Sequence, residues 1–147
     1  MHRAPPQKGG GWRLVPYILP SGRCPVFDEF FDQLRRTNLK RFVEYRDIWK
    51  PEFEKHGPLV GPPHWEPLRG GLFEIRWGRC RIYCSPESER RIVMYMGVVK
   101  RWPKFTNRDR RACEERRAEF LSPVYDQDER ERAYLALRKE RANNGLV

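Results

Sequence analysis

The clearest pattern in the chain is an alternation of apolar and polar residues on either side of Gly78-Arg79. A glycine and one further residue between two alternating runs are typical of a β-hairpin with a two-residue turn of type II′. This turn predicts that Arg76 faces Arg81 and that Glu74 faces Tyr83. Because alternate side chains share a face of a strand, one face of the hairpin is expected to be wholly apolar. Its members are Phe73, Ile75, Trp77, Cys80, Ile82 and Cys84.

Other stretches predict the remaining strands and a long loop. Residues 91–99 are almost continuously apolar, which is typical of a central strand covered on both faces. Residues 12–19 predict another strand, and Pro16 within it indicates an edge position. A polar turn is expected over residues 85–89. Residues 56–67 contain four prolines and two glycines, so we expect a loop there.

Four helices are predicted from apolar spacing and capping residues. They cover about residues 25–36, 38–55 (capped by Asn38), 107–121 (capped by Thr106) and 126–142. The buried stripes expected for the first two are Val26, Phe27, Phe30, Phe31 and Leu34, then Leu39, Phe42, Val43, Trp49 and Phe53. The last helix has only Tyr134, Leu137 and a few alanines as an apolar stripe. This predicts that the helix either docks weakly or is held for a partner, and that activity does not need this tail.

The order of these elements predicts an α+β fold with a mostly antiparallel sheet and two helices packed on one face. The other face is then left open, and it carries Arg76, Arg81, Tyr83 and the strand end at Lys100. Residues 1–11 are rich in proline and glycine and are expected to be disordered. Residues 12–122 form the expected domain, and residues 123–147 form a helical extension.

The positive charge of the chain is concentrated in one region. The formal net charge is +10, and residues 69–117 hold 14 basic and 6 acidic side chains, a net +8. A localised basic surface favours a polyanionic partner, with nucleic acid ahead of an anionic membrane. The alternative is a basic protein without such a partner.

The four cysteines do not form a metal-binding or disulfide pattern. Their spacing suits no zinc site. Cys80 and Cys84 are roughly 13 Å apart along a strand, which is too far for a disulfide. We therefore expect reduced thiols, as in a cytoplasmic protein, with no metal or other cofactor. No apolar run approaches the ~18 residues of a membrane span, and no signal peptide is recognisable, so no membrane partner is expected.

Several ordered motifs resemble one known family. They are GRCPVFDEFFDQL (22–34), EKHGPLVGPPHWEPLRGGLFEIRW (54–77), CRIYC (80–84) and MGVVKRWPK (96–104). Over about residues 12–121 the chain is similar to the phage-derived Gp49-like, HigB-type branch of the RelE/ParE toxin superfamily. The resemblance implies a RelE-like fold and the toxin of a type II toxin–antitoxin system. Such a toxin is a metal-independent endoribonuclease that cuts mRNA on the ribosome and binds a HigA-like antitoxin protein.

The resemblance also leaves other functions open. ParE-like members inhibit DNA gyrase by binding, and a phage or host regulator could keep the fold without activity. RelE-type toxins can carry a tyrosine early in the last helix, where this chain has Asn107.

The resemblance implies a site on the open sheet face and at the end of the last strand. The catalytic residues it implies are Arg76, Arg81, Lys100 and Arg101, and the RNA- or phosphate-binding residues are Arg69, Tyr83, Lys104, Arg108 and Arg111. Attack of a ribose 2′-OH on the adjacent phosphate needs a proton acceptor, cations and a proton donor. Lys100, crowded by arginines, is expected to have a lowered pKa and to move a proton.

Each of these residues also has a structural interpretation. Arg76 and Arg81 are alternatively solvated surface residues. Lys100, Arg101 and Lys104 are alternatively charges that limit aggregation of the preceding apolar strand. Packing is the more favoured role for Tyr83.

Overall fold

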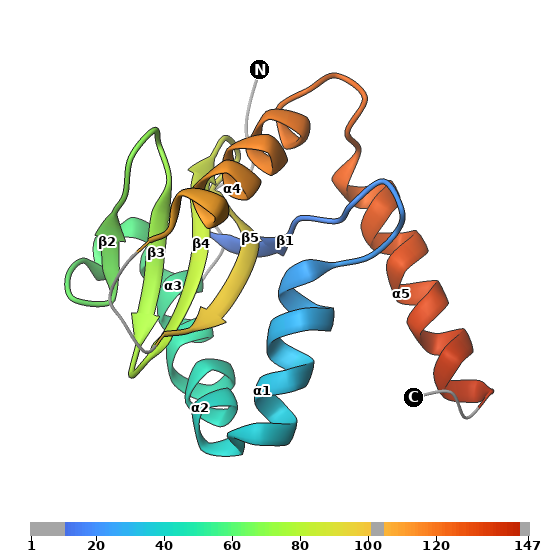
Figure 1. The fold of residues 1–147 in the computed structure, drawn as a ribbon, viewed down its shortest axis with the longest axis horizontal. Helices are drawn as coiled ribbons and strands as arrows, with labels where there is room; N and C mark the ends of the chain where they lie inside the picture. Colours follow the sequence, from blue (N-terminus) through green and yellow to red (C-terminus); the bar gives the residue numbers. More distant parts are fainter. Residues whose placement is uncertain (1–10, 101–104, 145–147) are drawn as a thin grey trace.

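The structure is a computed structural model that describes residues 11–100 and 105–144. It contains one five-stranded sheet in the order β1-β5-β4-β3-β2 (Figure 1). The strands are β1 (Arg13–Pro16), β2 (Trp65–Pro67), β3 (Phe73–Trp77), β4 (Cys80–Glu87) and β5 (Arg91–Val99). β1 pairs in parallel with β5, and every other pair is antiparallel. The predicted α+β class and mostly antiparallel sheet are therefore confirmed.

Two helical stretches connect β1 to the rest of the sheet. The first is η1 (Pro25–Phe31), wound as a π-helix, which continues into α1 (Asp32–Thr37). The second comprises α2 (Leu39–Glu44), η2 (Tyr45–Trp49) and α3 (Lys50–His56), followed by the short 3₁₀ helix η3 (Gly57–Val60). Asn38 caps α2 as predicted, because its side chain accepts a hydrogen bond from the backbone N–H of Arg41.

The predicted hairpin register is confirmed in every pair, including Arg76 with Arg81 and Glu74 with Tyr83. Gly78 has φ +54°, which suits the first position of a type II′ turn. A Cβ atom on Gly78 would also lie 2.7 Å from the guanidinium carbon of Arg41. The backbone conformation therefore favours glycine at this turn, whereas the flexible end of the Arg41 side chain could move aside.

The apolar face of the hairpin packs against the first two helical stretches and forms the larger core. All of its predicted members belong to this core, with Phe73 at its partly buried margin. The ring of Phe30 occupies the space beside Gly97 of β5, where a Cβ atom would lie 2.4 Å from the ring. A glycine in this strand thus lets η1 approach the sheet closely.

The second face of the sheet is not left open as predicted. α4 (Asn107–Phe120) crosses this face (Figure 1). Cys113 and Phe120 of α4 form a second core with Tyr83, Val93 and Tyr95 of the sheet. Tyr83 is fully buried and Arg81 is only 8% exposed. The prediction failed because it considered the first two helices as the sole cover of the sheet, whereas the third helix also packs on it.

Several boundaries also differ from the predictions. The predicted loop 56–67 contains β2, which adds an edge strand. β1 ends at Pro16 on the sheet edge, so the edge position is confirmed but the strand is shorter. β4 runs through Glu87, so the turn begins at Ser88. Leu39 was predicted to be buried but is 57% exposed.

The last helix, α5 (Gln127–Asn143), contacts η1 and α1 through polar groups. The Tyr134 hydroxyl donates to Asp28, and Arg138 forms ion pairs with Asp28 (3.3 Å) and Asp32 (3.0 Å). Tyr134 is 3% exposed and belongs to the larger core. Docking of α5 therefore depends mainly on ion pairs and one aromatic ring, which explains its sparse apolar stripe.

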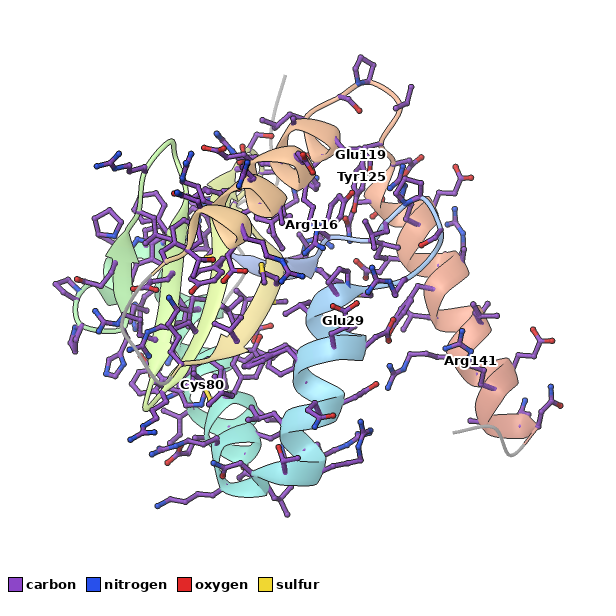
Figure 2. The ribbon with its side chains drawn as sticks, viewed as in Figure 1. Glu29, Cys80, Arg116, Glu119, Tyr125 and Arg141 are labelled. Atoms are coloured by element: carbon purple, nitrogen blue, oxygen red, sulfur yellow. The ribbon has the colours of Figure 1, made fainter. Side chains whose placement is uncertain are left out.

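The junction between α4 and α5 is a second anchor. Figure 2 shows Glu119 and Tyr125 where one helix ends and the other begins. The Tyr17 hydroxyl donates to Glu119 at 2.6 Å, and Tyr17 stacks on Tyr125 with ring centroids 5.6 Å apart. These contacts connect both C-terminal helices to the segment that follows β1.

All four cysteines are buried and none is in a disulfide. Burial raises the pKa of Cys80 to about 11, so its thiol stays protonated and unreactive at neutral pH. Among the described helices, none combines the length and apolar character that crossing a membrane requires.

Candidate active site

Four side chains of the β3–β4 hairpin and one that follows β5 form a charged cluster on the second face of the sheet. The cluster consists of Glu74, Arg76, Arg81, Tyr83 and Lys100. The hairpin register places the first four, and the backbone N–H of Lys100 donates to the carbonyl of Arg79 at 2.8 Å. The hairpin side chains and Lys100 thus meet on the face of the sheet that α4 crosses.

Glu74 lies between the two arginines. Its carboxylate is 3.6 Å from Nε of Arg76 and 3.9 Å from Nε of Arg81. Burial raises the pKa of Glu74 above its ordinary value, while Arg76 and Arg81 act in the opposite direction. A carboxylate whose pKa is raised in this way is a better proton acceptor than an ordinary one.

The two arginines differ in how firmly they are held. Nη1 of Arg81 donates to the carbonyl oxygens of Gly78 (2.9 Å) and Cys80 (2.8 Å), which fixes the orientation of its guanidinium group. The Arg76 side chain is 32% exposed. Among the described residues, its side chain makes two long ion pairs, to Glu66 at 3.7 Å and to Glu74 at 3.6 Å. Arg76 therefore retains N–H donors that a bound anion can use.

Lys100 and Tyr83 form the end of the cluster nearest to α4. Nζ of Lys100 lies 5.5 Å from the centre of the Tyr83 ring, in cation–π geometry. Burial lowers the pKa of Lys100, Glu74 and Asp109 act in the opposite direction, and Arg81 lowers it slightly further. The Tyr83 ring packs on Phe105, and its buried hydroxyl has no hydrogen-bond partner among residues 11–100 and 105–144. Packing is thus a confirmed role for Tyr83, and its hydroxyl is an unused polar group beside the cluster.

The other predicted site residues are distributed unevenly. Arg108 and Arg111 are exposed on the N-terminal half of α4. The same part of α4 carries Asp109, whose negative charge acts to raise the pKa of both the Tyr83 hydroxyl and the Lys100 ammonium group. Arg69 lies at the opposite end of β3 from Arg76, so the structure does not bring it into the cluster. Arg101 and Lys104 lie outside the described residues, as do residues 1–10 of the predicted disordered segment.

Two further arginines of α4 have structural roles. Nη1 of Arg116 donates to the backbone carbonyl of Tyr95 at 2.8 Å (Arg116 is labelled in Figure 2). Arg117 pairs with Glu87 at 2.8 Å. Part of the net +8 of residues 69–117 therefore attaches α4 to the sheet and is not available to a partner.

Glu74 is the residue that sequence reasoning undervalued. The hairpin register placed it beside both arginines, but the site that the resemblance implies contains only basic residues and Tyr83. His56 and His64 lie outside the cluster. His64 Nδ1 is 2.8 Å from the carbonyl oxygen of Arg76, and its ring lies 3.8 Å from that of Trp49. His56 is on an exposed helix end beside Glu52.

Comparison with known proteins gives no relative from which to transfer a function. The sequence matches none of the protein-family models and none of the curated proteins with which it was compared. Within the described residues, no group of three or more His, Cys, Asp or Glu side chains is placed to hold a metal ion. The chemistry of the site must therefore be inferred from the cluster itself.

The arrangement is suited to a phosphodiester. Arginine N–H groups match phosphate oxygens in geometry and charge, and the two opposed arginines can contact both non-bridging oxygens of one phosphate. The carboxylate and the ammonium group beside them can accept and donate protons.

Proposed function

We propose that this chain is an endoribonuclease toxin that cuts mRNA on the ribosome, as its resemblance to HigB-type toxins implies. The observation that carries the proposal is the gathering of Arg76, Arg81 and Lys100 around the partly buried carboxylate of Glu74. A polyanionic substrate that is cleaved by proton transfer needs this combination of groups.

The proposed reaction uses four side chains. Glu74 accepts the proton of a ribose 2′-OH, and the oxygen attacks the adjacent phosphorus atom. Arg76 and Arg81 bind the non-bridging oxygens, whose negative charge grows as the new bond forms. The bond from phosphorus to the 5′ oxygen breaks, and the Lys100 ammonium group donates a proton to that oxygen. The products are a 2′,3′-cyclic phosphate and a free 5′-hydroxyl.

The ribosome is proposed to supply the position of the RNA. Glu74 is paired with both arginines without substrate, so an incoming phosphate has to compete with it for the same donors. A ribosome that holds the mRNA in place offsets much of this cost, because positioning alone contributes a large part of catalysis. Exposed Arg108 and Arg111 are suited to contact the neighbouring phosphates. Action on ribosomes implies a cytoplasmic location.

A reconstituted translation reaction tests this directly. Purified protein is added to ribosomes engaged on a defined mRNA, and cleavage is mapped by primer extension, with the same RNA lacking ribosomes in parallel. We expect cuts only with ribosomes, and at least a hundredfold slower cutting by Glu74→Gln. The matched control is Glu115→Gln, which neutralises an exposed carboxylate on α4 and should leave the rate unchanged.

Pulse labelling after induced expression distinguishes the other functions. Under this proposal, protein synthesis falls before DNA synthesis. An earlier fall in DNA synthesis with an SOS response would instead indicate gyrase inhibition. Unchanged growth and synthesis would indicate a regulator without toxic activity.

A further inference from the structure

A groove lies between α5 and the first two helical stretches, away from the candidate active site. It has a volume of about 310 Å³. Aromatic and aliphatic side chains dominate its lining, among them Leu14, Phe27, Phe31, Phe42, Tyr45 and Tyr134. Leu14 packs on the larger core, whereas Tyr83 of the candidate site belongs to the second core. The groove and the candidate site are thus on opposite faces of the sheet.

The rim of the groove is basic. Four cations line it, namely Arg35, Arg46, Lys50 and Arg138, against one carboxylate, Asp32. Asp32 is already engaged by Arg138 at 3.0 Å. Arg46 and Lys50 pair with Asp47 and Glu54, which are outside the lining. These are pairs of exposed side chains, which contribute little to stability, so both cations can turn to an incoming carboxylate.

Two features extend the groove beyond a simple apolar cavity. The hydroxyl of buried Tyr45 donates only to the sulfur of Met94, at 3.7 Å, and a thioether is a weak acceptor. Leu135, which is 54% exposed, continues the apolar surface outward along α5. Leu135 is a lining residue that is largely exposed to water, and a bound polypeptide segment would cover it.

We propose that this groove binds an amphipathic, acidic segment of a partner protein. Large apolar side chains of the segment fill the groove, and its Asp or Glu residues meet the basic rim. An apolar floor with cations around it is complementary to such a segment in both shape and charge. This inference goes beyond the proposed function, because the groove does not contain the groups assigned to RNA cleavage.

Selection from a displayed library of random 16-residue peptides against the full-length protein tests the proposal. We expect enrichment of sequences that combine several acidic residues with large apolar residues at helical spacing. Selected peptides are then measured by fluorescence polarisation against wild type and against the double variant Arg46→Glu, Lys50→Glu. The variant should bind at least tenfold more weakly.

The matched control is the double variant Lys40→Glu, Arg132→Glu, which makes the same charge change at exposed positions outside the groove. It should bind as wild type does. Amide chemical-shift changes in the unmodified protein locate the peptide independently of any variant, and they should centre on α5 and α1. Failure to enrich acidic peptides, equal binding by both double variants, or shifts centred on β3 and β4 would each overturn the proposal. RNA cleavage is not the readout, so these outcomes are separate from the test of the proposed function.

Discussion

Arg76 and Arg81 occupy directly opposed positions on β3 and β4, and the carboxylate of Glu74 lies 3.6 Å and 3.9 Å from their Nε atoms. Like charges at opposed positions destabilise a sheet pair, and Glu74 offsets this repulsion. A phosphate bound between the arginines would do the same. The hairpin is therefore arranged to exchange an internal carboxylate for an external anion.

The two arginines should differ in their effect on stability. Like-charge repulsion alone predicts that removing either one stabilises the fold. Arg81→Met, however, removes hydrogen bonds to two backbone carbonyls from a buried side chain, so we expect a loss of about 1–2 kcal/mol. Arg76→Met removes a partly exposed side chain and should change stability by less than about 0.5 kcal/mol. Urea denaturation of both variants measures this, and equal losses would show that the distinction is wrong.

Tyr83→Phe should stabilise the protein. The hydroxyl of Tyr83 is buried and has no hydrogen-bond partner in the part of the chain that the structure describes, so its removal should increase the free energy of unfolding by about 1 kcal/mol. Tyr95→Phe is the matched control, since the Tyr95 hydroxyl is also buried but lies 2.6 Å from the hydroxyl of Ser85. That variant should lose about 1 kcal/mol. Thermal unfolding of the pair tests the prediction, which a destabilised Tyr83→Phe would refute.

Stability should depend on pH through Glu74. Burial raises the pKa of Glu74 in the folded protein above its ordinary value of 4.5, so the folded state binds this proton more tightly than the unfolded chain. The resulting stabilisation of the folded state is complete below pH 4.5, and it is lost as the pH rises through the raised pKa of Glu74 in the folded protein. Glu74→Gln lacks the titrating group, so its stability relative to wild type should increase over this window and then level off. Denaturation at a series of pH values measures the difference, and a constant difference would contradict the assignment.

Truncation after Pro123 should destabilise the domain. The sparse apolar stripe of α5 predicted a dispensable tail, but Tyr134 is in the larger core and Arg138 is paired with two carboxylates of η1 and α1. Tyr134→Ala alone should cost about 3 kcal/mol, because it removes a buried aromatic ring. Arg132→Ala, at an exposed position on the same helix, serves as the control. An unchanged melting temperature after truncation would support the original expectation.

Features determined by neighbouring residues were predictable from the sequence. The alternation around Gly78 specified the hairpin register, because a shift by one residue would put charged side chains into the core. The Asn38 and Thr106 caps marked the helix starts, because their side chains accept hydrogen bonds from backbone groups three residues on. The extent of β5 followed from its continuous apolar run.

Features determined by contacts between distant segments were not predictable in this way. The alternation identified a polar face on the hairpin, but only the packing of α4 decided that Tyr83 is buried there and Arg76 is not. The three-residue strand β2 is too short for a periodic signal and depends on pairing with β3. Leu39 has helical spacing but lies on an exposed side of α2.

The sequence by itself determined the local geometry of the candidate site, namely two arginines, a glutamate and a tyrosine at adjacent positions of one hairpin. The tertiary structure decided their chemical character. Burial in the folded protein shifts the pKa of Glu74 upward and that of Lys100 downward. The physical reason is that pairing in a strand is set by neighbouring residues, whereas the loss of water around a charged group depends on every segment that packs against it.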